Sequence, residues 1–434
     1  MAKLNQKVVN NRRTHEGTVA HPIKPIQELR RSVLACMLWE DTFYEEGQSI
    51  ADRIASLIKQ VTPEEVSALA IEARSKFKLR HVPLLLAREL ARSKGPIVSQ
   101  TLQQIIQRPD ELTEFLAIYW KDKKQPLSAQ VKKGLAKAFQ KFNGYQLAKY
   151  NRDNKIKLRD VLFLCHAKPK DEEQEKLWKQ LVDGALVTPD TWEVSLSSGK
   201  DKKETFQRLM AEETLGALAF LRNLRNMEQS GITKREVADY GIKINLGRVL
   251  PFRFIAAARA VPKWEDAIEP MMLKSMSEQP KLLGHTVIVV DNSGSMEGTK
   301  ISAKSELDRS DAACALAILV REICEDCSVI GFGSDAAFMP NRRGFALADA
   351  IKQGPGGGTD TERALNLAQS KPYDRIIVIT DEQSHTAIPH PKGKGYFINI
   401  ASYKNGIGYG SWTHIDGFSE SVIDWIREFE SSMQ

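Results

Sequence analysis

The sequence predicts a two-part chain, with an all-α front part joined to a doubly wound α/β domain. Short amphipathic helical patterns follow one another from Pro25, separated by proline, glycine or asparagine and with few strand signals between them. Beyond about residue 275 short apolar runs alternate with helical segments, which is typical of a parallel sheet covered by helices. We therefore place the two domains at residues 1–275 and 276–434.

Consecutive short helices favour stacked helical pairs, as in a solenoid, for the front part. Residues 1–23 lack helical periodicity and are expected to form an extended arm. Thr62 and Glu65 predict a helix start with a capping box. No exact sequence period is present, so an irregular helical bundle remains the alternative. Further helices are expected at Val82–Ala91, Val98–Ile106, Glu111–Trp120, Val131–Phe142, Val161–Leu164, Glu175–Leu181, Phe206–Met210, Leu215–Met227 and Val249–Ala260.

The back domain opens on Thr286–Val290, a short apolar run that predicts a buried parallel strand. A long helix is expected after it, at about Ile301–Asp326. The remaining elements are strands at Ser328–Phe332, Arg375–Thr380 and Tyr396–Ile400, helices at Gly344–Lys352, Thr361–Gln369 and Val422–Phe429, and a glycine loop at Gly354–Gly358. This alternation predicts a doubly wound domain with parallel strands.

The composition predicts a soluble, cytoplasmic chain without membrane contact, which we expect to be a monomer. No apolar run approaches the roughly 20 residues that span a bilayer. The N-terminus is polar and basic, and no apolar core of a secretory signal follows it. The five cysteines form a sparse, odd set, which argues for reduced thiols in the cytosol.

Charge is divided unevenly along the chain. Residues 1–275 carry a net charge of +13, whereas residues 276–434 carry −6. A basic domain attached to an acidic one indicates a polyanionic partner for the front part, with nucleic acid as the first choice.

Polar side chains with oxygen atoms follow the predicted strands of the back domain. Asp291, Ser293 and Ser295 come directly after the first strand, Thr359 follows the glycine loop, and Asp381 follows the strand at 375–380. Loops at the carboxyl ends of parallel strands lie at one edge of a sheet, so these groups are expected to converge. Carboxylates and hydroxyls are hard ligands that suit Mg²⁺ or another divalent cation. Taken singly, however, Asp-x-Ser segments are common in turns.

The order Asp-x-Ser-x-Ser, then Gly-Gly-Thr-Asp, then a strand ending in Thr-Asp resembles the von Willebrand factor A domain, which has a Rossmann-like fold. The resemblance implies a metal-ion-dependent adhesion site formed by Asp291, Ser293, Ser295, Thr359 and Asp381. Such a site holds a divalent cation and leaves one coordination position for the carboxylate of an acidic protein ligand.

A basic segment stands out in the front part. It contains Lys149, Arg152, Lys155 and Lys157, and it ends near His166. Lysines at every third or fourth position are also ordinary on a solvated helix face, and a lone histidine is often a core residue. Asp153 interrupts the basic run.

Three further segments add to this picture. They are Lys-Leu-Arg-Asp-Val-Leu-Phe-Leu-Cys-His-Ala-Lys-Pro at 157–169, Leu-Ala-Phe-Leu-Arg-Asn-Leu-Arg-Asn-Met at 218–227 and Val-Leu-Pro-Phe-Arg at 249–253. Together they resemble the TROVE module. Joined to a von Willebrand A domain, the whole chain resembles the Ro autoantigen family and its bacterial relatives.

The resemblance implies a ring of HEAT-like helical repeats that the A domain closes. It implies a ribonucleoprotein in which a Y RNA binds the basic outer face and single-stranded 3′ ends of misfolded RNA enter the central hole. Such a particle acts in RNA quality control or delivers RNA to a partner exoribonuclease. Lys149 and His166 carry over from the family motif, whereas Arg152, Lys155 and Lys157 are proposed by neighbourhood.

Two other functions compete with RNA binding. One is a metal-dependent protein-binding scaffold for which RNA is not the main ligand; a platform of that kind need not be basic. The other is an enzyme, which we do not expect, because the site lacks the pair of close metal ions usual in phosphoryl transfer. Cys324 and Cys327 have redox spacing, but the pattern places them at a helix end, where we expect structural cysteines.

Overall fold

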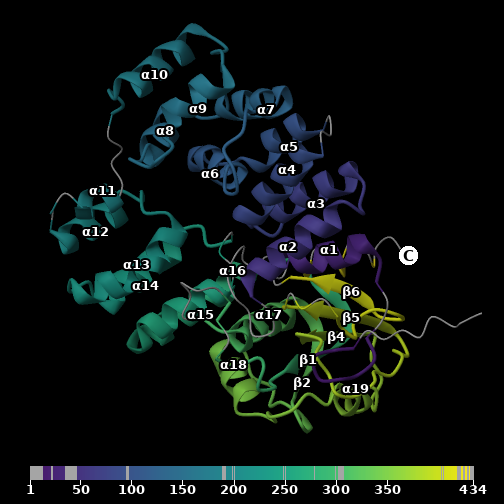
Figure 1. Cartoon of the computed structure of the whole chain (residues 1–434). Helices are drawn as coiled ribbons and strands as arrows, with labels where there is room; N and C mark the ends of the chain where they lie inside the picture. Colours follow the sequence, from purple (N-terminus) through teal and green to yellow (C-terminus); the bar gives the residue numbers. More distant parts are fainter. Residues whose placement is uncertain are drawn as a thin grey trace, which may run out of the picture. The chain divides into compact units, whose positions relative to one another are not determined.

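The computed structural model describes residues 13–20, 23–34, 46–93, 97–187, 192–197, 199, 201–247, 249, 251–277, 279–298, 300–301, 307–401, 403, 405–417, 422–423, 426–427 and 430. Contacts between residues divide the chain into two compact units (Figure 1). The helical unit contains residues 25–39 and 47–199. The mixed unit contains residues 1–24, 40–46 and 200–434.

Helices of the helical unit pack against their neighbours in the chain. Helix α3 contacts α4 and α5, α4 contacts α5 and α6, and α5 contacts α7. This nearest-neighbour packing is that of stacked helical pairs. The bounds are α1 Pro25–Leu34, α2 Gly47–Ile58, α3 Pro63–Ser75, α4 His81–Arg92, α5 Val98–Ile105, α6 Pro109–Tyr119, α7 Ala129–Phe139, α8 Gly144–Tyr150, α9 Leu158–Cys165, α10 Glu172–Asp183 and α11 Trp192–Ser197.

One continuous apolar core, from Leu29 to Leu181, runs through these helices. The predicted capping box is confirmed at the start of α3, where Thr62 and Glu65 exchange hydrogen bonds. Helix α9 shows how the sequence selects the buried face. Its residues at 158, 161, 162 and 165 are buried, which is the i, i+3, i+4, i+7 spacing of one helix face. Phe163 lies outside this stripe and is exposed.

The mixed unit begins its regular structure with further helices. These are α12 Lys202–Ala211, α13 Ala217–Gln229, α14 Lys234–Lys243, α15 Pro251–Ala260 and α16 Glu265–Met276, with a short 3₁₀ turn at Pro262–Trp264. Helices α15 and α16 pack against α17 (Arg309–Ile323), and α16 also contacts α18 (Gly344–Lys352). Phe345 N donates to Glu269 Oε1 at 2.7 Å, and this bond ties the start of α18 to α16.

A six-stranded sheet forms the centre of the mixed unit, in the order β3-β2-β1-β4-β5-β6. Strand β3 runs antiparallel to β2, and the other neighbours are parallel. The bounds are β1 Leu282–Asp291, β2 Cys324–Phe332, β3 Ala336–Phe338, β4 Arg375–Thr380, β5 Lys394–Asn399 and β6 Thr413–Asp416. The predicted α/β domain is confirmed, with one antiparallel edge strand added to its parallel sheet.

Helices cover both faces of this sheet. Helix α19 (Thr361–Ala368) packs on the face that contains Val287, Val289 and Val378. Ile288 and Ile377, on the opposite face, are equally buried, and α17 contacts β1, β2 and β4. Burial on both faces explains why these strands read as continuous apolar runs in the sequence.

The expected helix at Ile301–Asp326 is wrong at both ends. Helix α17 begins at Arg309, and Asp308 before it forms an antiparallel bridge with Lys300. Helix α17 stops at Ile323, and β2 begins at Cys324, where it pairs with Leu282 of β1. Residues 302–306 lie outside the described part of the chain. Cys324 and Cys327 therefore lie on a strand and not at a helix end. Both thiols are free, and burial raises the pKa of Cys324 to about 11, so neither cysteine is activated for redox chemistry.

Several short elements were not expected. They are α8, α11, α14, α16, β3 and β6, and α16 contains Pro270 within its length. The expected closing helix at 422–429 lies partly outside the described residues. The boundary at residue 275 stays a prediction.

Within the expected N-terminal arm, the described residues 13–20 turn back on themselves. Arg13 and Val19 form an antiparallel bridge, and Gly17 supplies a positive φ of 92° at the bend. Among the described residues, no helix combines the length and the apolar character that crossing a membrane requires.

Candidate metal centre and nucleic-acid interface

The carboxylates of the predicted metal site meet because β1 and β4 are neighbours. Asp291 is the last residue of β1, and Asp381 directly follows β4. Val290 pairs with Ile379 in parallel register, so both carboxylates reach the same edge of the sheet. Strand β1 has β2 on one side and β4 on the other, and this reversal of strand order is where α/β sheets bind ligands.

Hydrogen bonds join four of the five predicted ligands. Ser295 Oγ donates to Asp381 Oδ2 at 2.7 Å, and the hydroxyls of Ser293 and Ser295 are 3.2 Å apart. Ser293 N donates to Asp291 Oδ1 at 2.9 Å, and Thr380 Oγ1 donates to Asp291 Oδ2 at 2.5 Å. Asp291, Ser293, Ser295 and Asp381 therefore form one cluster. Thr380 joins it as a residue that sequence reasoning missed.

Thr359 is held beside this cluster by its backbone. Its carbonyl accepts from Ser384 Oγ at 3.0 Å and from His385 N at 3.2 Å. The glycine loop before it touches the first motif, since Gly294 N donates to the carbonyl of Gly357 at 2.8 Å. The loop needs glycine at position 357, where φ is +91° and a Cβ would lie 2.8 Å from Ser334 Oγ. The structure thus places Thr359 between the loops that carry the two carboxylates.

The electrostatics of the cluster favour a bound cation. Asp291 is 1% exposed and Asp381 is fully buried. Burial, and then the neighbouring charge of Asp381, raise the pKa of Asp291 to about 7. Arg309 Nη1 lies 3.9 Å from Asp381 Oδ2. Two buried like charges with hydroxyls around them form a donor set that fits Mg²⁺.

Hydroxyl oxygens are essential to that fit. In the described part of the chain, no group of three or more His, Cys, Asp or Glu side chains is arranged to hold a metal ion. A cation at this edge would be held by Asp291 and Asp381 with the serine and threonine hydroxyls, and water would complete its shell.

Four of the predicted RNA-binding residues lie around the start of α9. Lys149 is in the last turn of α8, and Arg152 and Lys155 are exposed in the connection that follows. Lys157 is the N-cap residue of α9, and its Nζ lies 2.6 Å from Asp153 Oδ1. Asp153 thus pairs with Lys157, and Arg152 and Lys155 are the exposed cations of this connection.

His166 lies at the other end of α9. It is the C-cap residue, exposed and in the left-handed conformation, with φ 52° and ψ 44°. The rise of an eight-residue helix separates it from Lys157 by roughly 13 Å. Its Nε2 lies 3.3 Å from Lys132 Nζ, so the ring accepts from the lysine. The predicted basic residues therefore form two groups, at opposite ends of α9.

Two arginines of the mixed unit also belong to a basic pair. Arg222 is on α13 and Arg253 is on α15, and both come from segments that resemble the TROVE module. Desolvation, and then the like charge of Arg222, lower the pKa of Arg253. Like charges brought together are a feature of anion-binding sites. Both sequence segments were noted, but nothing in the sequence indicates that Arg222 and Arg253 are neighbours.

Comparison with known families now identifies the chain. The TROVE domain family model matches residues 29–186 and 184–315, which together cover about two thirds of the chain. The chain belongs to the TROVE family. The model of the von Willebrand factor type A domain matches residues 286–383 of this TROVE-family chain. That second match contains all five residues of the predicted metal site, and the first TROVE match contains the basic groups at both ends of α9.

A solved structure shares the fold of this TROVE-family chain. It is the crystal structure of the Deinococcus radiodurans Ro (RSR) protein, with a TM-score of 0.63. The match covers 92% of this chain and 98% of that one at 16% sequence identity. At this identity the likeness shows a common fold. A comparison with curated proteins by sequence returned no match.

Proposed function

We propose that this TROVE-family protein binds RNA through the basic surface around α9. The observation that carries the proposal is the exposed connection between α8 and α9, which presents Arg152 and Lys155 from within the first TROVE match. Lysine and arginine side chains neutralise phosphates and position RNA without reading its sequence. The ligand we propose is a small structured noncoding RNA of the Y type.

We further propose a second RNA ligand, the single-stranded 3′ end of misfolded RNA. The Arg222 and Arg253 pair supports it, since two neighbouring guanidinium groups suit phosphates. In the arrangement expected for the family, the helical repeats form a ring and such an end enters its hole. The protein would then act in RNA quality control and hand RNA to an exoribonuclease in the cytoplasm.

A charge-reversal experiment tests RNA binding. Filter binding would use a stem-loop RNA with a single-stranded tail, over a range of salt concentrations. We expect the double variant Lys149→Glu, Lys155→Glu to bind at least tenfold more weakly and to flatten the salt dependence, because each phosphate contact adds about 0.7–0.9 to the slope of log affinity against log salt. Arg342→Glu is the matched control, because it reverses an exposed charge in the acidic domain. Unchanged affinity in the double variant would contradict the proposal.

A second function is proposed for the A domain, which is cation-dependent binding of a protein. The buried carboxylates of Asp291 and Asp381, with hydroxyls around them, favour this function. We propose Mg²⁺ or another divalent cation there, with an acidic side chain of a partner at the open position. This function is compatible with RNA binding by the helical repeats, and it is the alternative main function if RNA does not bind.

We propose binding without catalysis. One cluster outside the metal site has the geometry of a triad, with Ser328 Oγ 3.0 Å from His285 Nε2 and His285 Nδ1 2.7 Å from Asp326 Oδ2. An acyl-transfer site also needs N–H donors for an oxyanion. Here the N–H groups of Gly284 and His285 donate to carboxylates of Glu325 and Asp374. The cluster is therefore better suited to joining β1 and β2 than to chemistry.

A further inference from the structure

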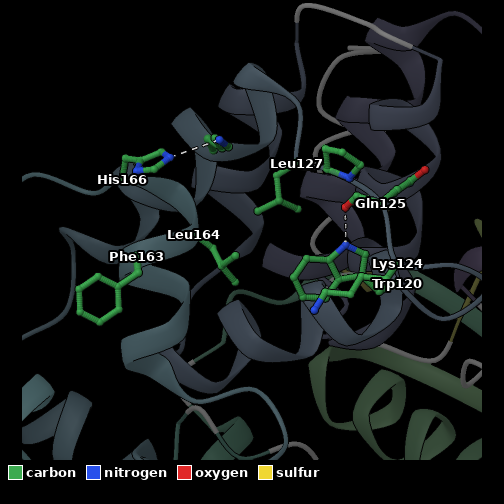
Figure 2. Close-up of a pocket in the computed structure, with 9 residues that line it drawn as sticks. Trp120, Lys124, Gln125, Leu127, Phe163, Leu164 and His166 are labelled. Carbon is green, nitrogen blue, oxygen red and sulfur yellow. Dashed lines mark hydrogen bonds between the residues drawn. The ribbon is translucent and has the colours of Figure 1, made fainter.

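A pocket of about 540 Å³ lies beside the C-terminal end of α9 (Figure 2). Leu127 and Leu164 form an apolar part of its lining. The rings of Trp120 and Phe163 lie on opposite sides of these two leucines (Figure 2). The volume is within the usual range of ligand pockets, roughly 300–1,000 Å³. All its lining residues belong to the helical unit.

Phe163 is the unusual member of this lining. It is 62% exposed, and it is the one phenylalanine among the large apolar side chains that the structure describes as exposed. Helix α9 packs against the core through the face that contains residues 158, 161, 162 and 165. The ring of Phe163 lies outside this face. An exposed aromatic ring that lines a pocket offers a face on which a flat ligand can stack.

Trp120 is held in position at the other side. Its Nε1 donates to the carbonyl of Gln125 at 2.8 Å, which orients the indole. Lys124 Nζ lies 5.5 Å from the centroid of the same ring. The indole is therefore an oriented aromatic surface with a cation over its ring.

The charged groups of the pocket all have one sign. Lys124 and Lys132 line it together with His166, and no Asp or Glu side chain is among its described lining residues. His166 Nε2 accepts from Lys132 Nζ at 3.3 Å, so its Nδ1 carries the ring proton and is a donor. Aromatic rings, an apolar floor and cations without acids suit a flat aromatic ligand attached to phosphate.

We propose that this pocket binds unpaired nucleobases of single-stranded RNA, stacked against Phe163 and Trp120 with the neighbouring phosphates near Lys124 and Lys132. Bases on aromatic side chains beside basic groups are the usual mode for single strands. The inference rests on the proposed RNA function and adds to it. The pocket at the C-terminal end of α9 would bind unpaired bases. The connection between α8 and α9, at the N-terminal end of α9, would bind the backbone of structured RNA.

Fluorescence of 2-aminopurine tests this assignment. The base would be placed in the single-stranded tail of a stem-loop RNA and titrated with the full-length protein. We expect its emission to be quenched by stacking on the native protein. Phe163→Ala should remove most of the quenching and weaken tail binding by about 5- to 150-fold, the range for loss of one base–aromatic stack. The salt dependence should stay unchanged, because no charge is removed.

Controls separate stacking from other effects. Phe163→Tyr keeps a ring and should keep the native affinity and quenching. Leu283→Ala removes an exposed apolar side chain elsewhere in the chain and should change neither. A tail with abasic linkers should bind the native protein at least as weakly as the normal tail binds Phe163→Ala, because it loses the stack on Trp120 as well.

Three results would overturn the inference. Native affinity in Phe163→Ala, or equal affinity for the abasic tail, would show that the pocket takes no base and would leave it to another occupant, such as an apolar side chain of a protein. In both cases salt-dependent binding of the tail-less stem-loop would keep the proposed RNA function intact. If the native protein bound neither the stem-loop nor the tail, both proposals would fall together.

Discussion

At the scale of single residues, the carboxylate of Glu430 binds side chains of two neighbouring strands, β4 and β5. Its carboxylate accepts two hydrogen bonds from Arg375, both of 2.8 Å, and one from Lys394 of 2.7 Å. Tyr396 donates from its hydroxyl at 3.0 Å. Burial opposes ionisation, but these donors outweigh it and lower the pKa of Glu430 to about 2.

Glu430→Gln should lower the free energy of unfolding by about 3 kcal/mol at neutral pH, because it leaves the buried guanidinium of Arg375 uncompensated. The pH dependence follows from the lowered pKa. In the native protein this stabilisation is fully present above about pH 4.3, which is the pKa of a glutamate in an unfolded chain. It is lost as the pH falls toward 2, the pKa of Glu430 in the folded protein. Urea denaturation at pH 7 and near pH 3 would measure it. The difference between variant and native protein should shrink in acid, and a constant difference would contradict the assignment.

The motifs alone predicted that Asp291, Ser293, Ser295 and Asp381 come together, because neighbouring parallel strands bring their carboxyl ends to one edge of the sheet. Metal binding there stays a prediction. The aromatic pocket was not predicted. Phe163 stands outside the buried stripe of α9, and this could have been noticed in the sequence. Trp120 comes from a different helix pair, and only packing brings it near. The separation of His166 from Lys157 could likewise be predicted only once the length of α9 was known.

At the scale of elements, β1 and β4 were predictable because both are short apolar runs buried on both faces. The boundary between α17 and β2 was not. Residues 321–326 are mostly polar and suit a helix end. Cys324 and Asp326 nevertheless pair with β1, so residues 324–326 are the start of a strand. Edge strands β3 and β6 have three and four residues, too few for a periodic pattern.

One short segment supports the metal cluster from far away in the sequence. Thr14 Oγ1 donates to the carbonyl of Ser384 at 3.0 Å, and His15 N donates to Gln383 Oε1 at 2.7 Å. Gln383 in turn donates from its N to Asp381 Oδ1 at 3.2 Å and from Nε2 to the carbonyl of Asp381 at 3.1 Å. Residues 13–20 thus hold the loop that carries one of the carboxylates.

Deletion of residues 1–20 should therefore weaken binding of Mg²⁺ severalfold without removing it, because Asp291 and the serines stay in place. Isothermal titration of the full chain and the deletion variant with Mg²⁺ measures the difference. The substitution Thr14→Val keeps the segment but removes the hydroxyl, which donates to Ser384 and accepts from Thr18 N, and it should give a smaller loss in the same direction. Tighter binding in either variant would show that the segment does not position the loop.

At the scale of the whole molecule, the basic and acidic parts of the chain separate two kinds of ligand. The +13 charge of residues 1–275 favours polyanions, and the −6 charge of residues 276–434 disfavours them. The predicted metal ligands are all in the acidic part, and the predicted RNA ligands are all in the basic part. This division predicts that the two binding functions are independent.

Asp291→Asn tests that independence. Mg²⁺ should raise the melting temperature of the native protein by several degrees and leave that of the variant unchanged, since a ligand stabilises only the state it binds. The affinity of the variant for the stem-loop RNA should equal that of the native protein within about twofold. Equal losses of RNA affinity and Mg²⁺ response in a folded variant would show that the two functions are coupled.

The nearest-neighbour packing of α1 to α10 has a consequence for how such a chain can change over time. Each helix packs against helices one to three places away in the chain, so the stabilising contacts are local. Gene duplication or loss of a helical pair alters the number of units and leaves every remaining interface in place. The sheet has no such freedom, because removing β1 or β4 would destroy both the register and the cluster at its edge. We therefore expect relatives of this protein to differ in length mainly among their helices.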